Sequence, residues 1–123
     1  MVATETGKSG LALLFAGTST RVPDFTNLGT GSGAGGAAVT ALVTEIRRTA
    51  YTTRDVTVQK KVTYTTDFDA VTMSGTLPIK EIGIIASGTG AADTLYSIEA
   101  FANNAITFDG TNELQVQVEY TIY

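Results

Sequence analysis

The side chains of this chain that could carry out acid–base chemistry are mainly carboxylates, because the 123-residue sequence contains no His and no Cys. A general base would therefore have to be Asp or Glu. Asp67 and Asp69 form a D-x-D pair, and Asp93 and Asp109 lie in segments of loop composition. Carboxylates and loop carbonyls can bind calcium, but this spacing lacks the glycine and the distal glutamate of a calcium-binding loop.

Two carboxylates could also hydrolyse a glycosidic bond if the fold brought them together, since spacing along the chain does not fix their separation. The sequence offers no Trp as a platform for a sugar ring. We expect these acids to serve in turns and on solvated faces. The sequence therefore predicts no enzymatic activity and no metal site.

Two glycine-containing segments have the form of nucleotide-binding motifs. Gly31, Gly33 and Gly36 spell G-x-G-x-x-G, with Asp55 further along the chain. A dinucleotide site needs a buried parallel strand before the glycines and a βαβ series around them, whereas the segment before these glycines contains Pro23. The Gly-Lys-Ser run at 7–9 lacks the upstream glycine of a phosphate-binding loop. We expect no cofactor.

The charge of the chain excludes several classes of partner. Twelve acidic and eight basic residues give a formal net charge of −4. The basic residues are scattered, with adjacent pairs only at Arg47-Arg48 and Lys60-Lys61, so we expect no nucleic-acid binding. The apolar run Leu11–Ala16 is too short to span a membrane, and Glu5 argues against a secretion signal at the N-terminus. The absence of Cys excludes a disulfide framework.

The segment Asn112–Tyr123 is the clearest structural signal. Its apolar side chains from Leu114 to Ile122 alternate with Gln, Glu and Thr, which is the period of a half-buried strand. Abundant Thr and Gly favour strands separated by turns. The sequence predicts a mainly β fold, namely a single-domain antiparallel β-sandwich or barrel-like fold with one short α-helix, covering residues 1–123 with a flexible N-terminal arm at about 1–9.

Other elements are expected from local patterns. Val39, Leu42, Val43 and Ile46 have helical spacing, which predicts the one helix over Ala37–Ala50. A strand is expected at Leu11–Ala16. The segment Leu77–Ala86 is apolar at both parities, which predicts a central strand covered on both faces. Further strands are expected at Val56–Phe68, Thr94–Ala102, Ala105–Phe108 and Leu114–Tyr123, the last two forming a hairpin.

The order of several short motifs resembles a known class of protein. The segment PDFTNLGTGSG is followed by T-A-L-x-x-E-x-x-R, which includes Glu45 and Arg48, by E-I-G at Glu81–Gly83, and by the closing LQVQVEYTI. This order, from about Pro23 to Ile122, resembles small β-rich virion proteins of tailed bacteriophages, of the tail-fibre, tail-associated or head-decoration type. The resemblance implies a structural virion protein that forms a homo-oligomer, for instance a trimer, and has other virion proteins as partners.

The motif residues have structural interpretations. Glu45 and Arg48 could form an ion pair, worth a few tenths of a kcal/mol if exposed. Arg48 could instead reach Glu81 across the core, where removal of one partner would be more damaging. Gly83 interrupts an apolar strand, which suggests a bulge or the close approach of another backbone.

Contacts with other subunits are expected at the loops 29–36 and 87–93, at the N-terminal arm, and at the edge of the terminal strand. The candidate contact residues are Lys8, Phe25, Gly31, Gly33, Thr89, Asp93 and Tyr123.

The alternative function is a module that binds carbohydrate or another component of the host surface. It rests on the five tyrosines, because Tyr is favoured at protein and sugar interfaces. Tyr64 and Tyr120 share parity with core residues and are expected to be buried. Tyr51, Tyr96 and Tyr123 are the candidates for exposed positions.

Overall fold

The computed structural model describes residues 2–17, 22–31, 36–58, 60–69, 77–86, 93–100, 106–108 and 113–121. Its elements are β1 (Val2–Ala3), α1 (Glu5–Phe15), β2 (Phe25–Gly29), β3 (Glu45–Ala50), β4 (Thr53–Val58), β5 (Lys61–Phe68), β6 (Leu77–Ile79), β7 (Glu81–Ala86), β8 (Thr94–Ala100), β9 (Ile106–Phe108) and β10 (Leu114–Thr121). Among these residues α1 is the one helix, and it lacks the length needed to cross a membrane.

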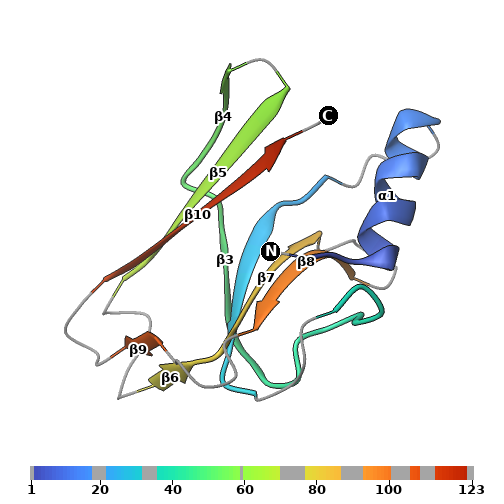
Figure 1. The fold of residues 1–123 in the computed structure, drawn as a ribbon. Coiled ribbons are helices and arrows are strands. Elements are labelled where there is room, and N and C mark those ends of the chain that lie inside the picture. Colours follow the sequence, from blue (N-terminus) through green and yellow to red (C-terminus); the bar gives the residue numbers. More distant parts are fainter. Residues whose placement is uncertain are drawn as a thin grey trace.

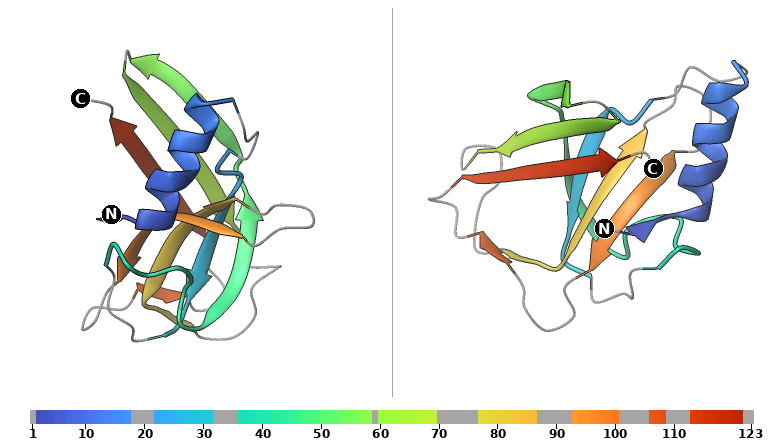
Figure 2. Two further views of the ribbon diagram at one scale, coloured as in Figure 1. Left: turned by 90° about the vertical axis from the view of Figure 1, so that its right-hand side faces the viewer. Right: turned by 45° about the horizontal axis from the view of Figure 1, so that its top comes forward.

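The strands form a mainly β fold built from antiparallel sheets, as the sequence predicts. A five-stranded sheet has the order β1-β8-β7-β2-β3, a three-stranded sheet has the order β10-β5-β4, and β6 pairs with β9. Figures 1 and 2 show the two larger sheets facing each other and α1 standing beside β8.

The main core lies between the two larger sheets. Leu28 from β2 and Ile84 from β7 meet Phe68 from β5 and Val116 and Val118 from β10 in one buried cluster. Burial of side chains of this size removes enough apolar surface from water to hold the sheets together. The two sheets are therefore layers of one sandwich.

A second cluster covers the other face of the five-stranded sheet. Leu42 packs there against Ile85, Leu95 and Ile98, with Val39 partly buried beside them. Segment 36–44 therefore acts as a cover for this face. Because β7 lies in the middle of its sheet and all six of its residues are buried, the predicted central strand covered on both faces is confirmed for Glu81–Ala86.

The helix lies at a different place from the one expected. Residues 45–50 form strand β3, which pairs with β2 from Phe25↔Ala50 to Gly29↔Glu45, so the predicted helix over 37–50 is wrong. The apolar residues with helical spacing do not share a face, because Leu42 is buried while Val43 is 64% exposed. Their spacing arises from a covering loop that leads into an edge strand.

Residues 11–15 are helical and Ala16 caps the helix, so the predicted strand at 11–16 is also wrong. Helix α1 begins after Thr4, whose Oγ1 accepts a hydrogen bond from the Gly7 N–H at 2.9 Å. A Cβ on Gly7 would lie 2.6 Å from the Tyr96 Cα, so glycine permits the helix to contact β8 directly. Strand β1 and the first half of α1 occupy residues 2–9, where the sequence predicts a flexible arm.

The terminal strand is confirmed over Leu114–Thr121. Val116 and Val118 are buried, and the alternating residues Gln115, Gln117 and Glu119 are exposed. The predicted hairpin of the last two strands is wrong, because β9 pairs with β6 and β10 pairs with β5 over its whole length. Strand β10 therefore belongs to the three-stranded sheet, where it forms one edge.

Candidate subunit-contact site

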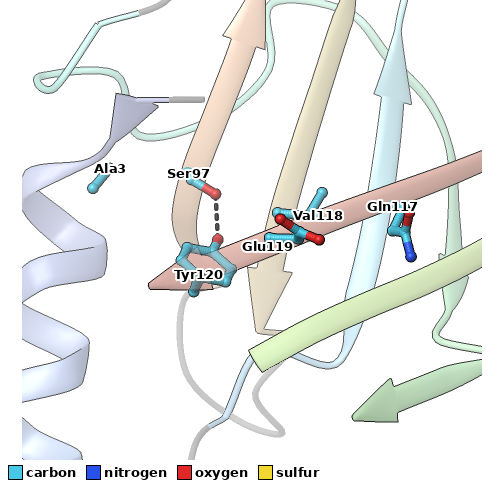
Figure 3. A pocket seen from close by; sticks show the side chains of 6 residues that line it. All are labelled: Ala3, Ser97, Gln117, Val118, Glu119 and Tyr120. Carbon is cyan, nitrogen blue, oxygen red and sulfur yellow. Dashed lines mark hydrogen bonds between the residues drawn. The ribbon is translucent and has the colours of Figure 1, made fainter. Parts of the chain in front are cut away.

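Strand β10 forms an open edge on one side of the sandwich. Within the described part of the chain it pairs only with β5, and the facing edge of the other sheet is the two-residue strand β1 beside β8. An edge strand presents backbone N–H and C=O groups that have no partner in its own sheet. Figure 3 shows the ends of β8 and β10 crossing at this place.

A cavity of about 380 Å³ lies between the two edges. It is lined by Ala3 and Ser97 on one side and by residues 117–120 of β10 on the other. The Tyr120 hydroxyl and the Ser97 Oγ share a hydrogen bond that connects the two sheets (Figure 3). The cavity and the edge of β10 are thus one continuous surface.

The edge of β10 carries none of the usual features that prevent strand addition. Its eight residues pair with β5 without a register shift, and they include neither Pro nor Lys. Glu119 is its one charged residue, and the carboxylate forms an ion pair with Lys61 at 2.9 Å. Long regular edges of this kind are templates for another strand, whereas protected edges carry bulges, prolines or lysines.

The phenol of Tyr120 is held neutral at this edge. Burial raises the pKa of Tyr120 to about 12, and the hydrogen bond with Ser97 opposes that shift. Its ring packs edge-on against Tyr64, with the ring centres 5.8 Å apart, and Tyr64 packs on Tyr51 at 4.4 Å. The aromatic cluster therefore fixes the orientation of the side chain that connects the sheets.

Replacement of Tyr120 by Phe is expected to lower the free energy of unfolding by about 1 kcal/mol, because the hydrogen bond between Tyr120 and Ser97 is lost. The pH dependence supplies a second measurement. Since the folded pKa lies above the unfolded value near 10, the contribution of this group is complete below pH 10 and is lost as pH rises toward 12. Chemical denaturation should show that the free energy of unfolding falls less between pH 8 and pH 11 in Tyr120→Phe than in the parent chain. An equal fall in the two proteins would contradict this.

A larger groove lies on the other side of Tyr120, between α1 and the three-stranded sheet. It has a volume of about 500 Å³, and Ala3 and Tyr120 line both this groove and the smaller cavity. Most of its lining is apolar, including Leu11 and Leu14 from α1 and Val62 from β5. Three lysines stand around it, namely Lys8, Lys60 and Lys61.

Glu81 is the most deeply buried carboxylate among the described residues, with 1% of its surface exposed. Its oxygens accept hydrogen bonds from the backbone N–H groups of Gly31 at 3.1 Å, Val43 at 2.7 Å and Thr44 at 3.2 Å. The side chain thus connects β7 to the segments before and after the 32–35 stretch. This is a structural role, because all three partners are backbone amides of the same chain.

The predicted pair Glu45–Arg48 is confirmed, whereas the alternative partner Glu81 is wrong for Arg48. Arg48 donates to Glu45 at 3.0 Å and to Asp93 at 3.2 Å. Glu45 and Arg48 both lie on strand β3 rather than on a helix. The predicted approach of another backbone at Gly83 is wrong, because side chains lie there instead: a Cβ would clash with the Asn27 side chain and lie 2.9 Å from Leu95 Cδ1. The irregularity in the pairing of β7 with β8 falls between Ile84 and Ile85.

The structure disperses the predicted contact residues. Lys8 is exposed beside the groove and pairs with Glu5 at 3.1 Å. Phe25 packs at the second core cluster, Gly31 is buried against Glu81, and Asp93 pairs with Arg48. Gly33, Thr89 and Tyr123 lie outside the described residues.

Two of the carboxylates singled out by the sequence, Asp67 and Asp93, have partners in the structure. Asp67 accepts hydrogen bonds from the Thr52 hydroxyl at 3.0 Å and from the Gln115 amide at 2.9 Å. Asp109 lies outside the described residues. In the part of the chain that the structure describes, no three His, Cys, Asp or Glu side chains gather as a metal site would require.

The residues around the β10 edge were only partly accessible to sequence reasoning. The alternation in β10 identifies Gln117 and Glu119 as outward-facing. No pattern in the sequence indicates the role of Ser97, because that role depends on the crossing of β8 and β10. Comparison of the chain with protein-family models, curated proteins and solved structures gives no match.

Proposed function

We propose that this chain is a structural protein of a tailed-phage virion that acts through contacts with other subunits. The order of motifs from Pro23 to Ile122 supports the class of protein. The position within the particle is either a compact tail-associated module or a capsid decoration protein. Its partners are further copies of the chain and other virion proteins.

The unprotected edge of β10 is the observation that carries this proposal. A strand from a neighbouring subunit would satisfy its outward backbone groups and cover the cavity lined by Ser97 and Tyr120. Pairing of two β10 strands around a two-fold axis gives a dimer. Pairing of β10 with the edge strand β4 of the next copy gives a ring, and a trimer is one closed form of such a ring.

Several large apolar side chains are exposed on α1 and on β4, the strand at the opposite edge of the three-stranded sheet from β10. Phe15 at the end of α1 is 84% exposed, Leu13 is 51% exposed and Val56 on β4 is 72% exposed. Isolated apolar residues are common on protein surfaces, and exposed apolar side chains also occur where another subunit packs. Such residues would lose their contact with water when a neighbouring subunit packs on them.

The tyrosines do not favour the alternative of carbohydrate binding. Tyr64 is buried, as predicted, and Tyr96 is only 4% exposed although the sequence predicts it to be accessible. Tyr51 and Tyr120 pack against the core and Tyr123 lies outside the described residues. The four described rings therefore form no exposed platform for a sugar.

Immunogold labelling of intact phage particles with antibody against this chain tests the proposal. Label over the capsid would identify a decoration protein, and label confined to the tail would identify a tail-associated module. An antibody against a known capsid subunit of the same particles provides the positive control. Particles that bind the control antibody but never this one would contradict a virion role.

A further inference from the structure

The groove between α1 and the three-stranded sheet has a chemical character distinct from the rest of the molecule. The chain carries twelve acidic residues, yet no Asp or Glu is among the described residues that line this groove. Three lysines line it instead, and the chain has only one other, Lys80. An apolar hollow bordered by cations is complementary to a molecule with an apolar body and an anionic group.

Lys60 is the cation whose charge remains uncompensated there. Lys8 pairs with Glu5 at 3.1 Å and Lys61 pairs with Glu119 at 2.9 Å. Within the described part of the chain Lys60 has no ion-pair partner, and its side chain is exposed in the turn between β4 and β5. The turn therefore presents a free ammonium group at the rim of an apolar groove.

The backbone at Lys60 adopts a conformation that is uncommon for lysine. Its φ of +67° is in the left-handed region, which glycine and asparagine adopt more readily. The local geometry of the turn therefore favours a different residue type. The lysine supplies an ammonium group that Gly or Asn would not, at the point where the groove opens.

The lining favours an aliphatic chain over a segment of another protein. A peptide brings one N–H donor per residue, and each buried donor needs an acceptor. Beyond the hydroxyls of the tyrosines and of Thr121, the described side chains around the groove include no acceptor such as a carboxylate or a carboxamide. An aliphatic chain has no donors to satisfy, and the groove volume of about 500 Å³ is within the usual range for small-molecule sites.

We propose that this groove binds a single-chain anionic amphiphile, with the chain between α1 and β5 and the anionic group at Lys60. Leu11 and Leu14 form the α1 side of the chain-binding region, and Val62 and Tyr64 form the sheet side. The groove shares Ala3 and Tyr120 with the cavity at the β10 edge, but binding of an amphiphile in it requires neither strand pairing nor the virion role.

Titration calorimetry with dodecanoate, below its micelle concentration, tests the proposal on the full chain. We expect saturable binding of dodecanoate at one site per chain. In a series of shorter alkyl carboxylates, each added methylene should lower the dissociation constant by up to about fourfold. Lys60→Asn should weaken binding about threefold to tenfold while leaving the hairpin at least as stable. Lys80→Asn, which removes the lysine outside the groove, is the matched control and should bind as the parent does.

A second variant and a second measurement locate the site. Val56→Glu places a carboxylate at an exposed position on the groove rim and should weaken dodecanoate binding without unfolding the chain. Methyl NMR should show shifts at Leu11 and Leu14 on addition of dodecanoate. Absence of saturable binding, equal weakening by Lys60→Asn and Lys80→Asn, or shifts confined to other methyls would overturn the proposal. If the Leu11 and Leu14 methyls became covered only in assembled particles, the groove would be a contact site for a protein partner, and this result would also overturn the proposal.

Discussion

Replacement of Glu81 by Ala is expected to lower the free energy of unfolding by about 3 kcal/mol or more, which is a large effect for a single substitution. The carboxylate accepts from three backbone N–H groups, at Gly31, Val43 and Thr44. Loss of a buried acceptor leaves each donor without a partner, at about 1–3 kcal/mol apiece, and entering water recovers part of this. Urea denaturation followed by circular dichroism measures the difference.

Two further variants make the Glu81 result specific. In Glu81→Gln one oxygen remains to accept from Gly31 and Thr44, but the amide NH₂ would face the Val43 N–H, so an intermediate loss is expected. Glu113→Ala removes a carboxylate at an exposed position and should change stability little. If Glu81→Ala were as stable as Glu113→Ala, the carboxylate would not be what holds the two segments together.

The second large effect is expected at the β10 edge. Among antiparallel registers that keep the outward side chains of both copies on the same face, the two with the greatest overlap place Gln117 opposite Gln117 or opposite Glu119 of the second copy. Gln117→Glu puts like charges opposite each other in both registers, so self-association should weaken about tenfold or more. Gln117 is exposed on β10, so the fold itself should tolerate the change. Sedimentation velocity over a range of concentrations measures the association constant.

The companion variant Gln117→Lys identifies the register. It would face another lysine in the first register and weaken association, but would face Glu119 in the second and strengthen it. Thr40→Glu adds the same charge as Gln117→Glu at an exposed position outside β10 and serves as the control. Equal association by Gln117→Glu, Thr40→Glu and the parent chain would remove β10 from any contact between copies.

The strands that could be predicted from sequence are those whose pattern reflects their burial directly. Strand β10 has one buried and one exposed face, so its side chains alternate. Strand β7 is covered on both faces, so it is apolar throughout most of its length. Both patterns result from local burial and need no knowledge of the partner strands.

The helix, which the sequence predicts in the wrong segment, shows where local patterns do not suffice to predict secondary structure. Helix α1 contains Gly7 and Gly10, which lower intrinsic helix propensity, and its stability depends on direct contact with Tyr96 of β8. In contrast, segment 37–50 has apolar residues at helical spacing, but pairing with β2 decides its conformation from residue 45 onward. Tertiary contacts thus determine the conformation of both segments, and they override the conformation that each local sequence pattern favours.

The candidate site was predictable only in part for the same reason. The sequence identifies β10 as a terminal strand with an edge that could pair, and it predicts that Tyr120 points inward. The bond from Tyr120 to Ser97 and the groove beside α1 depend on how three distant segments meet. Lys8 lies far along the sequence from the adjacent Lys60 and Lys61, so no motif connects it with them.

Hydrogen exchange of this chain, free in solution and within purified phage particles, tests most directly whether β10 is a subunit contact. Exchange detected by mass spectrometry resolves peptides that cover 114–121. We expect half of the amides of β10, those facing away from β5, to exchange readily in the free chain and to become protected in the particle. Exchange of β10 that is identical in the two states, with the chain demonstrably present in the particle, would contradict a role for this edge in subunit contacts.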